Sequence, residues 1–237
     1  MNYRIDIADN IEKRVRTYIE KCLGDIAEKR IVALASGGMD SAVLLKLLDL
    51  MGYRIIITTI NTRSRSSRER EALRDIASEI GNIEAFHELE APDLLEYVEL
   101  YGTWYKDDSK REPYYIPARN IIFLGYAAYI AEIYGVRAIV TAHNKGDGSL
   151  LPDASEDFMK KVSEILSTYV PGLRVCMPLS VLDKVEIAIL GISIGAPINK
   201  SWSCYDYLNK PCGRCRGCVE RERALETARK ILFSRRF

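Results

Sequence analysis

Residues 31–45 have the sequence Ile31-Val-Ala-Leu-Ala-Ser-Gly-Gly-Met-Asp-Ser-Ala-Val-Leu-Leu45, which predicts a strand, a tight loop and a helix in succession. The apolar run at 31–35 is typical of a buried strand, and the apolar residues after position 42 recur at helical spacing. Between them, Gly37 and Gly38 let the main chain come close to a ligand. The start of the helix offers free N–H groups and a partial positive charge. We therefore expect this loop to hold a pyrophosphate group.

The side chains of the same loop also suit phosphate chemistry. Ser36 and Ser41 supply hydroxyl donors, and Asp40 is placed to hold Mg²⁺ against phosphate oxygens. The loop is not a Walker loop, because no Gly-Lys-Ser/Thr follows it. Residues 36–41 resemble instead the SGGxDS signature of the PP-loop ATP pyrophosphatase (N-type) superfamily. That resemblance implies cleavage of ATP between the α- and β-phosphates, with adenylation of a substrate oxygen. The simpler alternative is a tight turn with incidental serines.

The composition is that of an ordinary globular protein, with 48% hydrophobic and 28% charged residues. A length of 237 residues suits one α/β domain with appendages. The net charge of +1 provides no extended positive field, so we expect no direct binding of nucleic acid. No apolar run approaches the roughly 20 residues that span a bilayer, and the N-terminus lacks the apolar core of a signal peptide. We expect a cytoplasmic protein without a membrane partner.

Alternating strand and helix signals predict an α/β fold with a doubly wound, mostly parallel sheet. Three successive isoleucines at 55–57 indicate a strand that is buried on both faces, as in a parallel sheet. The helix at 10–29 is expected to pack against the domain edge, and the alternative is a dimerisation arm. The expected strands lie at 31–35, 54–60, 83–89 and 137–142, with 177–179 closing the sheet. The expected helices lie at 10–29, 66–80, 121–134 and 156–169, with a loop at 148–155 and a further helix from Lys184.

Ligands of doubly wound folds bind at the carboxyl ends of the strands, near the switch in strand order. Thr58, Thr59 and Asn61 are therefore candidates for the adenine side of a nucleotide site. Arg119 and Asn120 follow a proline at a predicted helix N-terminus, where an arginine suits an anionic nucleotide or substrate. A third strand carries His87, which we expect to be a strand-end residue and not a ligand.

Two segments leave their roles open. Residues 63–70 are dense in arginine and serine, and we favour a solvated loop that enters the next helix over a phosphate contact. Residues 92–115 interleave aromatic and polar residues. This composition suits either a wall over a flat substrate or a surface insertion packed by its own rings.

Four of the six cysteines crowd together near the C-terminus, with the spacing Cys204-x7-Cys212-x2-Cys215-x2-Cys218. Four thiolates at this spacing suit a closed, tetrahedral zinc site that holds the C-terminal helix in place. An iron–sulfur cluster and redox-active cysteines are the competing interpretations. In the reducing compartment that we expect, clustered cysteines favour metal over disulfides. The other two, Cys22 and Cys176, stand alone in the sequence, and Cys176 has no evident partner.

The combination of motifs resembles one family of the superfamily, the 7-cyano-7-deazaguanine (preQ0) synthases, or QueC family. The resemblance covers most of the chain after residue 30. It is most specific at 202–205 and 211–218. The other matching positions are 36–41, 117–120, Asp147, Pro152, Asp153, Phe158 and 184–187.

The resemblance implies that the substrates are 7-carboxy-7-deazaguanine, ammonia and ATP, and that the product is the nitrile. The carboxylate would be adenylated and converted to the amide by ammonia, and a second adenylation would then allow loss of AMP. Positioning and charge neutralisation suffice for such chemistry, without a nucleophilic side chain. A homodimer is the expected assembly.

The sequence thus predicts three sets of site residues and three parts of the chain. The N-terminal helical extension is expected at 1–30, the PP-loop domain at 31–200 and a zinc-binding helical appendage at 201–237. The expected catalytic residues are Asp40, Arg119 and Lys184. The structural Zn²⁺ is expected on Cys204, Cys212, Cys215 and Cys218. The expected nucleotide-binding residues, for ATP with Mg²⁺, are Leu34, Ala35, Ser36, Gly37, Gly38, Met39, Asp40, Ser41, Ala42, Val43, Leu44, Thr59 and Asn120.

The chain departs from the family pattern after the fourth strand, where family members usually carry Asp-Tyr-Ser-Gly-Tyr-Pro-Asp-Cys-Arg. Residues 147–155 lack both tyrosines, the cysteine and the arginine of that motif. A divergent synthase, or a paralogue that joins a deazaguanine acid to another acceptor such as a protein amine, would fit these changes. A tRNA thiolase or amidotransferase synthetase of the superfamily and a non-enzymatic binding module are the further alternatives.

Overall fold

The computed structural model describes residues 2–62, 65–94, 116–205 and 209–233. Its centre is a five-stranded sheet in which every pairing is parallel. The strand order is β3-β2-β1-β4-β5, so the chain moves from β1 outward to one edge and then returns to fill the other. This confirms the doubly wound α/β fold, whose switch in strand order lies between β1 and β4. The strands are β1 (Arg30–Leu34), β2 (Arg54–Asn61), β3 (Ile83–Glu90), β4 (Ala138–Thr141) and β5 (Arg174–Cys176).

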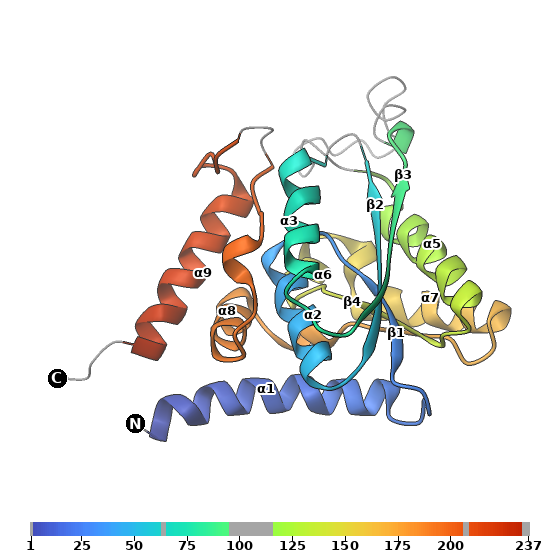
Figure 1. Ribbon diagram of the computed structural model, residues 1–237, viewed down its shortest axis with the longest axis horizontal. Coiled ribbons are helices and arrows are strands. Elements are labelled where there is room, and N and C mark those ends of the chain that lie inside the picture. The colour runs from blue at the N-terminus through green and yellow to red at the C-terminus, as the bar shows by residue number, and fades with distance from the viewer. Residues whose placement is uncertain (1, 63–64, 95–115, 206–208, 234–237) are drawn as a thin grey trace.

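Helices cover both faces of the sheet (Figure 1). On one face lie α2 (Met39–Leu50), α3 (Ser67–Ala77) and α8 (Lys184–Ser193), with α9 (Arg216–Phe233) packed on α8. On the other face lie α5 (Arg119–Tyr134) and α7 (Glu156–Tyr169). Shorter elements connect them: α6 (Asp147–Leu150), η2 (Pro152–Ala154), η3 (Pro178–Val181) and η4 (Ile198–Lys200).

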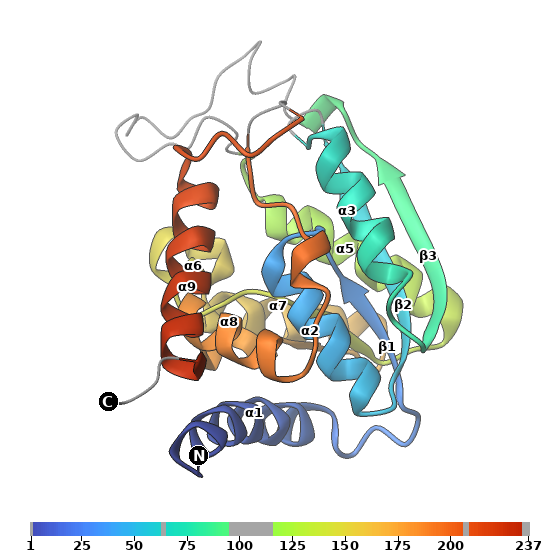
Figure 2. The same cartoon turned by 60° about the vertical axis from the view of Figure 1, so that its left-hand side comes forward.

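The first helix, α1 (Asn2–Leu23), lies across the end of the molecule away from the C-terminal end of β3 (Figures 1 and 2). Its apolar residues Ile11, Val15 and Ile19 are buried and belong to the same core as the strands. Each such side chain contributes about 1.5–3 kcal/mol by leaving water. Ile55, Ile56 and Ile57 of β2 are fully buried, as the sequence predicts for a strand covered on both faces. The division of the chain at residues 30 and 200 stays a prediction.

Some predicted boundaries were wrong. The first helix was expected at 10–29, but it spans Asn2–Leu23, so both ends differ. Gly24 follows the last turn, where the chain passes so close to Glu20 O that a Cβ would lie only 2.3 Å from it. The expected strand at 177–179 is instead the start of η3, since Pro178 has no N–H to donate to a sheet, and β5 precedes it. The expected loop at 148–155 contains most of α6 and all of η2. Residues 95–115, which include most of the predicted aromatic wall, lie outside the described residues.

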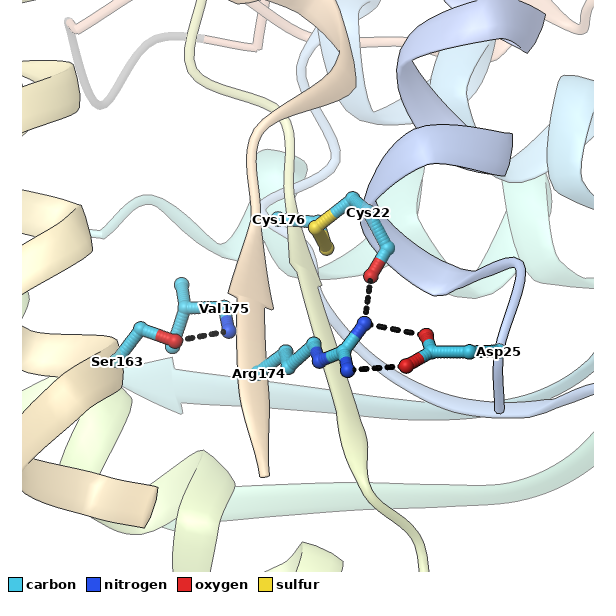
Figure 3. The surroundings of a disulfide bond; sticks show 6 residues. All are labelled: Cys22, Asp25, Ser163, Arg174, Val175 and Cys176. Atoms are coloured by element: carbon cyan, nitrogen blue, oxygen red, sulfur yellow. Dashed lines mark hydrogen bonds and ion pairs between the residues drawn. A yellow bond between two sulfur atoms is a disulfide. The ribbon is translucent and has the colours of Figure 1, made fainter. Parts of the chain in front are cut away.

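Cys22 and Cys176 form a disulfide, so the expectation that Cys176 has no partner was wrong (Figure 3). The bridge joins α1 to the edge strand β5 across 154 residues of sequence. Beside it, Arg174 donates to Cys22 O at 2.9 Å and to both carboxylate oxygens of Asp25 (Figure 3). The pairing was missed because it depends on how α1 packs against the sheet, which sequence spacing does not reveal.

Among the described residues, no helix combines the length and the apolar character that crossing a membrane requires.

Candidate functional site

The loop at 36–38 lies between β1 and α2, at the C-terminal end of the central strand. Gly37 has a φ of 91°, which an L side chain rarely adopts, and a Cβ there would lie 2.4 Å from Glu69 O of α3. Gly38 is the N-cap of α2 and makes no side-chain capping bond. The first amides of α2 therefore keep the unsatisfied donors and the partial charge that suit an anion.

Two hydroxyl groups meet inside this loop. Ser41 Oγ accepts from the backbone N–H of Ser36 at 3.1 Å and lies 3.4 Å from Ser36 Oγ. Ser36 Oγ in turn accepts from the N–H of Gly38 at 3.3 Å. The structure thus brings the two predicted serines together. Five neighbouring residues that were also predicted to bind nucleotide have buried side chains. A nucleotide would therefore contact their main-chain atoms. These residues are Ala35, Met39, Ala42, Val43 and Leu44.

Asp40 and Lys184, both predicted as catalytic, lie side by side. Asp40 Oδ2 accepts from Lys184 Nζ at 2.7 Å and from Asn144 Nδ2 at 2.9 Å. The other carboxylate oxygen, Oδ1, is buried and has no hydrogen-bond partner among the described residues. Burial alone would lower the pKa of Lys184, but the charge of Asp40 and the hydrogen bond to it prevail and raise that pKa. An unpartnered carboxylate oxygen beside a free helix N-terminus is the kind of ligand that Mg²⁺ takes.

Arg65 is a buried member of the site that sequence reasoning missed. We expected a solvated loop at 63–70, but the side chain of Arg65 is only 6% exposed. Its guanidinium donates to Ser36 O at 2.6 Å, to Asn61 Oδ1 at 2.7 Å and to Thr59 Oγ1 at 2.5 Å. Burial lowers the pKa of Arg65, while the charge of Glu69 acts in the opposite direction. Thr59 and Asn61 at the end of β2 could have indicated Arg65 from the sequence, because buried acceptors at a strand end require a donor.

The predicted candidates at the end of β2 therefore face inward. Thr58, Thr59 and Asn61 are all buried, and the last two are engaged by Arg65. Asn61 also donates to Glu90 at 2.6 Å. His87 lies within β3, and its Nε2 is 2.8 Å from the hydroxyl of Tyr134.

Arg119 and Asn120 are the first two residues of α5, and hydrogen bonds join Asn120 to the segment after β4. The preceding residue, Ala118, has a left-handed φ of 52°. Asn120 donates from its backbone N–H to Asp153 Oδ2 at 3.2 Å and from Nδ2 to Asp153 O at 2.9 Å. Burial raises the pKa of Glu69, and the charge of Arg119 acts in the opposite direction. Burial lowers the pKa of His143, and the charge of Arg119 lowers it further. Arg119 thus acts electrostatically on Glu69 of α3 and on His143 of the loop after β4.

The loop after β4 adds His143, which sequence reasoning did not single out. Its Nδ1 lies 2.9 Å from Thr141 Oγ1, and Asp147 accepts from the N–H of Asn144 at 2.9 Å. Burial lowers the pKa of His143, with the charge of Asp147 acting in the opposite direction. His143 could have been found from the sequence, because it directly follows a buried strand, where ligands of such folds bind.

Four thiols gather where α9 begins, and their sulfurs all lie within 4.8 Å of one another. A zinc ion with Zn–S bonds of about 2.3 Å places tetrahedral sulfurs about 3.8 Å apart. Cys212 Sγ and Cys218 Sγ lie 4.0 Å apart, close to that spacing. The donor set therefore fits one tetrahedral metal ion, on the four predicted residues Cys204, Cys212, Cys215 and Cys218.

The local backbone prepares one of the four cysteines, Cys212, for metal. Hydrogen bonds from the N–H groups of Arg214 and Cys215 lower the pKa of Cys212 to about 6, which favours the thiolate that a metal requires. Burial raises the pKa of Cys218 to about 12. The N–H of Cys212 also donates to Cys204 Sγ at 3.3 Å.

Trp202 connects the cysteine cluster with the loop at 36–38. Its backbone N–H donates to Gly37 O at 3.0 Å, and its indole Nε1 donates to Cys204 O at 2.9 Å. The two strongest signals of the sequence, the glycine loop and the cysteine motif, are therefore joined in space through this one residue.

A family model described as queuosine biosynthesis protein QueC matches residues 30–229. The chain belongs to the QueC family. It is 34% identical over 216 residues to a 7-cyano-7-deazaguanine synthase of Nitratiruptor sp., covering 84% of this chain and 94% of that one. It is 33% identical over 235 residues to 7-cyano-7-deazaguanine synthase 2 of Sulfurisphaera tokodaii, covering 93% of this chain and 49% of that one. The chain thus spans about half the length of the first curated relatives that it matches.

Solved structures share the fold of this QueC family member. The tRNA thiolase NcsA from Methanococcus maripaludis, solved with its iron–sulfur cluster, aligns with a TM-score of 0.58 at 15% identity. That alignment covers 98% of this chain and 81% of NcsA. NMN synthetase from Francisella tularensis aligns with a TM-score of 0.53 at 14% identity, covering 97% and 98% of the two chains. At such low identity, these likenesses show the PP-loop fold alone.

Proposed function

We propose that the chain is a 7-cyano-7-deazaguanine synthase that uses ATP to convert 7-carboxy-7-deazaguanine and ammonia into the nitrile. Membership of the QueC family and the names of the relatives support the substrate class. The observation that carries the proposal is Asp40, which has one buried oxygen without a partner among the described residues, next to Lys184 and to the free N-terminus of α2. With Mg²⁺ on that oxygen, the arrangement would neutralise the negative charge of the phosphates when a carboxylate attacks the α-phosphorus of ATP.

The proposed reaction has two similar halves. An oxygen of the substrate carboxylate bonds to the α-phosphorus and pyrophosphate leaves. Ammonia then replaces AMP at the acyl carbon and loses one proton, which gives the amide. The amide oxygen attacks a second ATP, pyrophosphate leaves again, and loss of AMP together with two N–H protons gives the nitrile. Each half needs neutralisation of phosphate charge and alignment of the reacting atoms.

The residues of the chain divide this work. The amides that follow Gly37 and the hydroxyls of Ser36 and Ser41 would bind the phosphate oxygens, and Lys184 would oppose the charge on the leaving pyrophosphate. Arg119 would hold an anionic part of the nucleotide or the substrate. Asp40 would hold Mg²⁺, which when bound neutralises phosphate oxygens. The four cysteines would hold a structural Zn²⁺ away from the chemistry.

The proposal extends to the surroundings of the enzyme. Free ammonia is the proposed nitrogen source, a homodimer the proposed assembly and the cytoplasm the proposed compartment. Nucleic acid and membrane are not among the proposed partners, since the net charge of +1 supplies no extended positive field.

The test is mass spectrometry of the products after incubation with ATP, Mg²⁺, ammonium and 7-carboxy-7-deazaguanine. Nitrile formed together with AMP and pyrophosphate would support the synthase. AMP without nitrile would indicate adenylation for another acceptor, and no AMP would contradict the proposal. Asp40→Asn should abolish AMP release. Asp157→Asn, which changes an exposed Asp–Lys pair on α7, is the matched control and should retain it.

A further inference from the structure

Two consecutive carbonyl groups of the loop are held from different sides. Arg65 donates to Ser36 O at 2.6 Å, and the backbone N–H of Trp202 donates to Gly37 O at 3.0 Å. Arg65 precedes α3, whereas Trp202 belongs to the segment that leads into the cysteine cluster. Two parts of the chain that are far apart in sequence therefore meet on adjacent peptide groups.

The geometry of the peptide bond gives these contacts a consequence. In a planar trans peptide, the C=O and the N–H point in opposite directions. Fixing Ser36 O therefore fixes the N–H of Gly37, and fixing Gly37 O fixes the N–H of Gly38. Both N–H groups belong to the stretch proposed to bind phosphate. The N–H of Gly38 donates to Ser36 Oγ at 3.3 Å, and it would exchange that hydroxyl for a phosphate oxygen. A hydrogen bond to either carbonyl determines where the following amide points.

The Arg65 side of the arrangement is rigid. Its side chain is 6% exposed and is also held by Thr59 and Asn61, so it has little freedom to turn away. Glycine at position 37 lets the loop pass close to α3, since a Cβ there would lie 2.4 Å from Glu69 O.

The Trp202 side is also supported. Its indole donates to Cys204 O at 2.9 Å. The residue before it, Ser201, is tied to α9, since Arg221 donates to Ser201 Oγ and, at 2.8 Å, to Ile198 O. These hydrogen bonds hold the segment that carries the N–H of Trp202 in place.

We propose that Arg65 and Trp202 form a carbonyl clamp that orients the amides of Gly37 and Gly38 for the phosphates of ATP. The clamp rests on the proposed function and deepens it. Both are positioning residues, because neither is assigned a contact with the nucleotide. The clamp holds both peptide groups in place before an anion binds, which reduces the ordering cost at the moment of binding.

The experiment measures the Kd of ATP and of inorganic pyrophosphate by calorimetry on the folded, metal-loaded protein. Trp202→Pro removes the N–H, and Trp202→Ala, which keeps it, is the reference. The backbone of Ser201, with φ −74° and ψ 151°, accepts a following proline. We expect Trp202→Pro to bind pyrophosphate about three- to tenfold more weakly than Trp202→Ala, the effect of one hydrogen bond.

Arg65→Lys tests the other side, since it keeps the charge but loses the planar fork. We expect about tenfold weaker binding of pyrophosphate. Arg68→Lys, on the exposed side of α3, is the matched control and should bind as the wild type does. Melting temperatures are measured for all variants, because a purely structural role would lower Tm and leave the Kd of the folded fraction unchanged.

Equal Kd values for Trp202→Pro and Trp202→Ala, together with an unchanged Kd for Arg65→Lys, would overturn the clamp. If Trp202→Pro does not fold, Arg65→Lys decides alone. Failure of the wild type itself to bind ATP or pyrophosphate would instead refute the proposed function, and the clamp with it.

Discussion

Lys184 Nζ lies 2.7 Å from Asp40 Oδ2, so the first turn of α8 meets the first turn of α2 across 144 positions of sequence. The side chain of Asp40 is 12% exposed and that of Lys184 is 32% exposed. The pair thus lies partly shielded from water, where charges interact more strongly than on an open surface.

Lys184→Gln should reduce AMP release by about 10²–10³-fold, the effect of removing one charged donor from a developing anion. AMP formation is measured at saturating ATP, and Tm is measured in parallel. Lys161→Gln changes the exposed partner of Asp157 and should leave the rate within about twofold, as for other surface pairs. Full activity of Lys184→Gln would remove Lys184 from the catalytic set.

Gly37→Ala should destabilise the fold and abolish nucleotide binding. Its left-handed backbone costs about 1–2 kcal/mol with an L side chain, and the contact with Glu69 O adds about 1–3 kcal/mol by overpacking. Gly52→Ala is the matched control, because Gly52 has a φ of 77° but no atom within 4 Å of its Cβ position. Urea unfolding of both variants separates the two effects, and equal losses of stability would show that the loop can move away from α3.

His143 makes the stability of the fold depend on pH. Its folded-state pKa lies below the ordinary value of 6.5, so the folded protein binds fewer protons there than the unfolded chain. This contribution is complete above 6.5 and is lost as the pH falls toward the folded-state pKa. Between about pH 7 and about pH 5, the wild type should lose more stability than His143→Gln, by at most about 1.4 kcal/mol per pH unit. The free energy of unfolding is measured with urea at both pH values. Equal losses of stability in the wild type and in His143→Gln would contradict this.

Cys215→Ser should lose the bound metal and stability together, because metal binding and local folding are coupled. Metal content by mass spectrometry identifies the ion, and the absence of visible absorption distinguishes zinc from an iron–sulfur cluster. A chelator should lower the Tm of the wild type and leave that of the variant unchanged. A stable, metal-free variant would show that the cluster has no structural role.

Reduction of the Cys22–Cys176 bridge should lower stability by about 2–5 kcal/mol, since it closes a long loop. For a chain of this size, the fall in Tm is roughly 5–15 °C. Cys22→Ala/Cys176→Ala should have the lower Tm already and should not respond to reductant. Thiol titration of the denatured, chelated protein checks the pairing: six cysteines less the two in the bridge leave four reactive thiols.

The features that were predicted correctly depend only on residues close together in the sequence. The β1–loop–α2 unit follows from apolar spacing and two glycines, and the cysteine cluster follows from spacing within one segment. Asp40 and Lys184 were each proposed, but nothing local indicates that they touch. Arg65 was missed for a similar reason. An arginine among serines and charges suggests solvent, and only the fold shows that Thr59 and Asn61 surround it.

The contact between Trp202 and Gly37 has a consequence for how the protein is made. The loop at 36–38 leaves the ribosome before Trp202, the residue whose N–H holds Gly37 O. The strand, the loop and α2 can form while synthesis continues. The described geometry of the loop, however, is complete only once Trp202 has been added and its segment has folded back. A nascent chain therefore acquires its full nucleotide loop only when most of these residues have been synthesised.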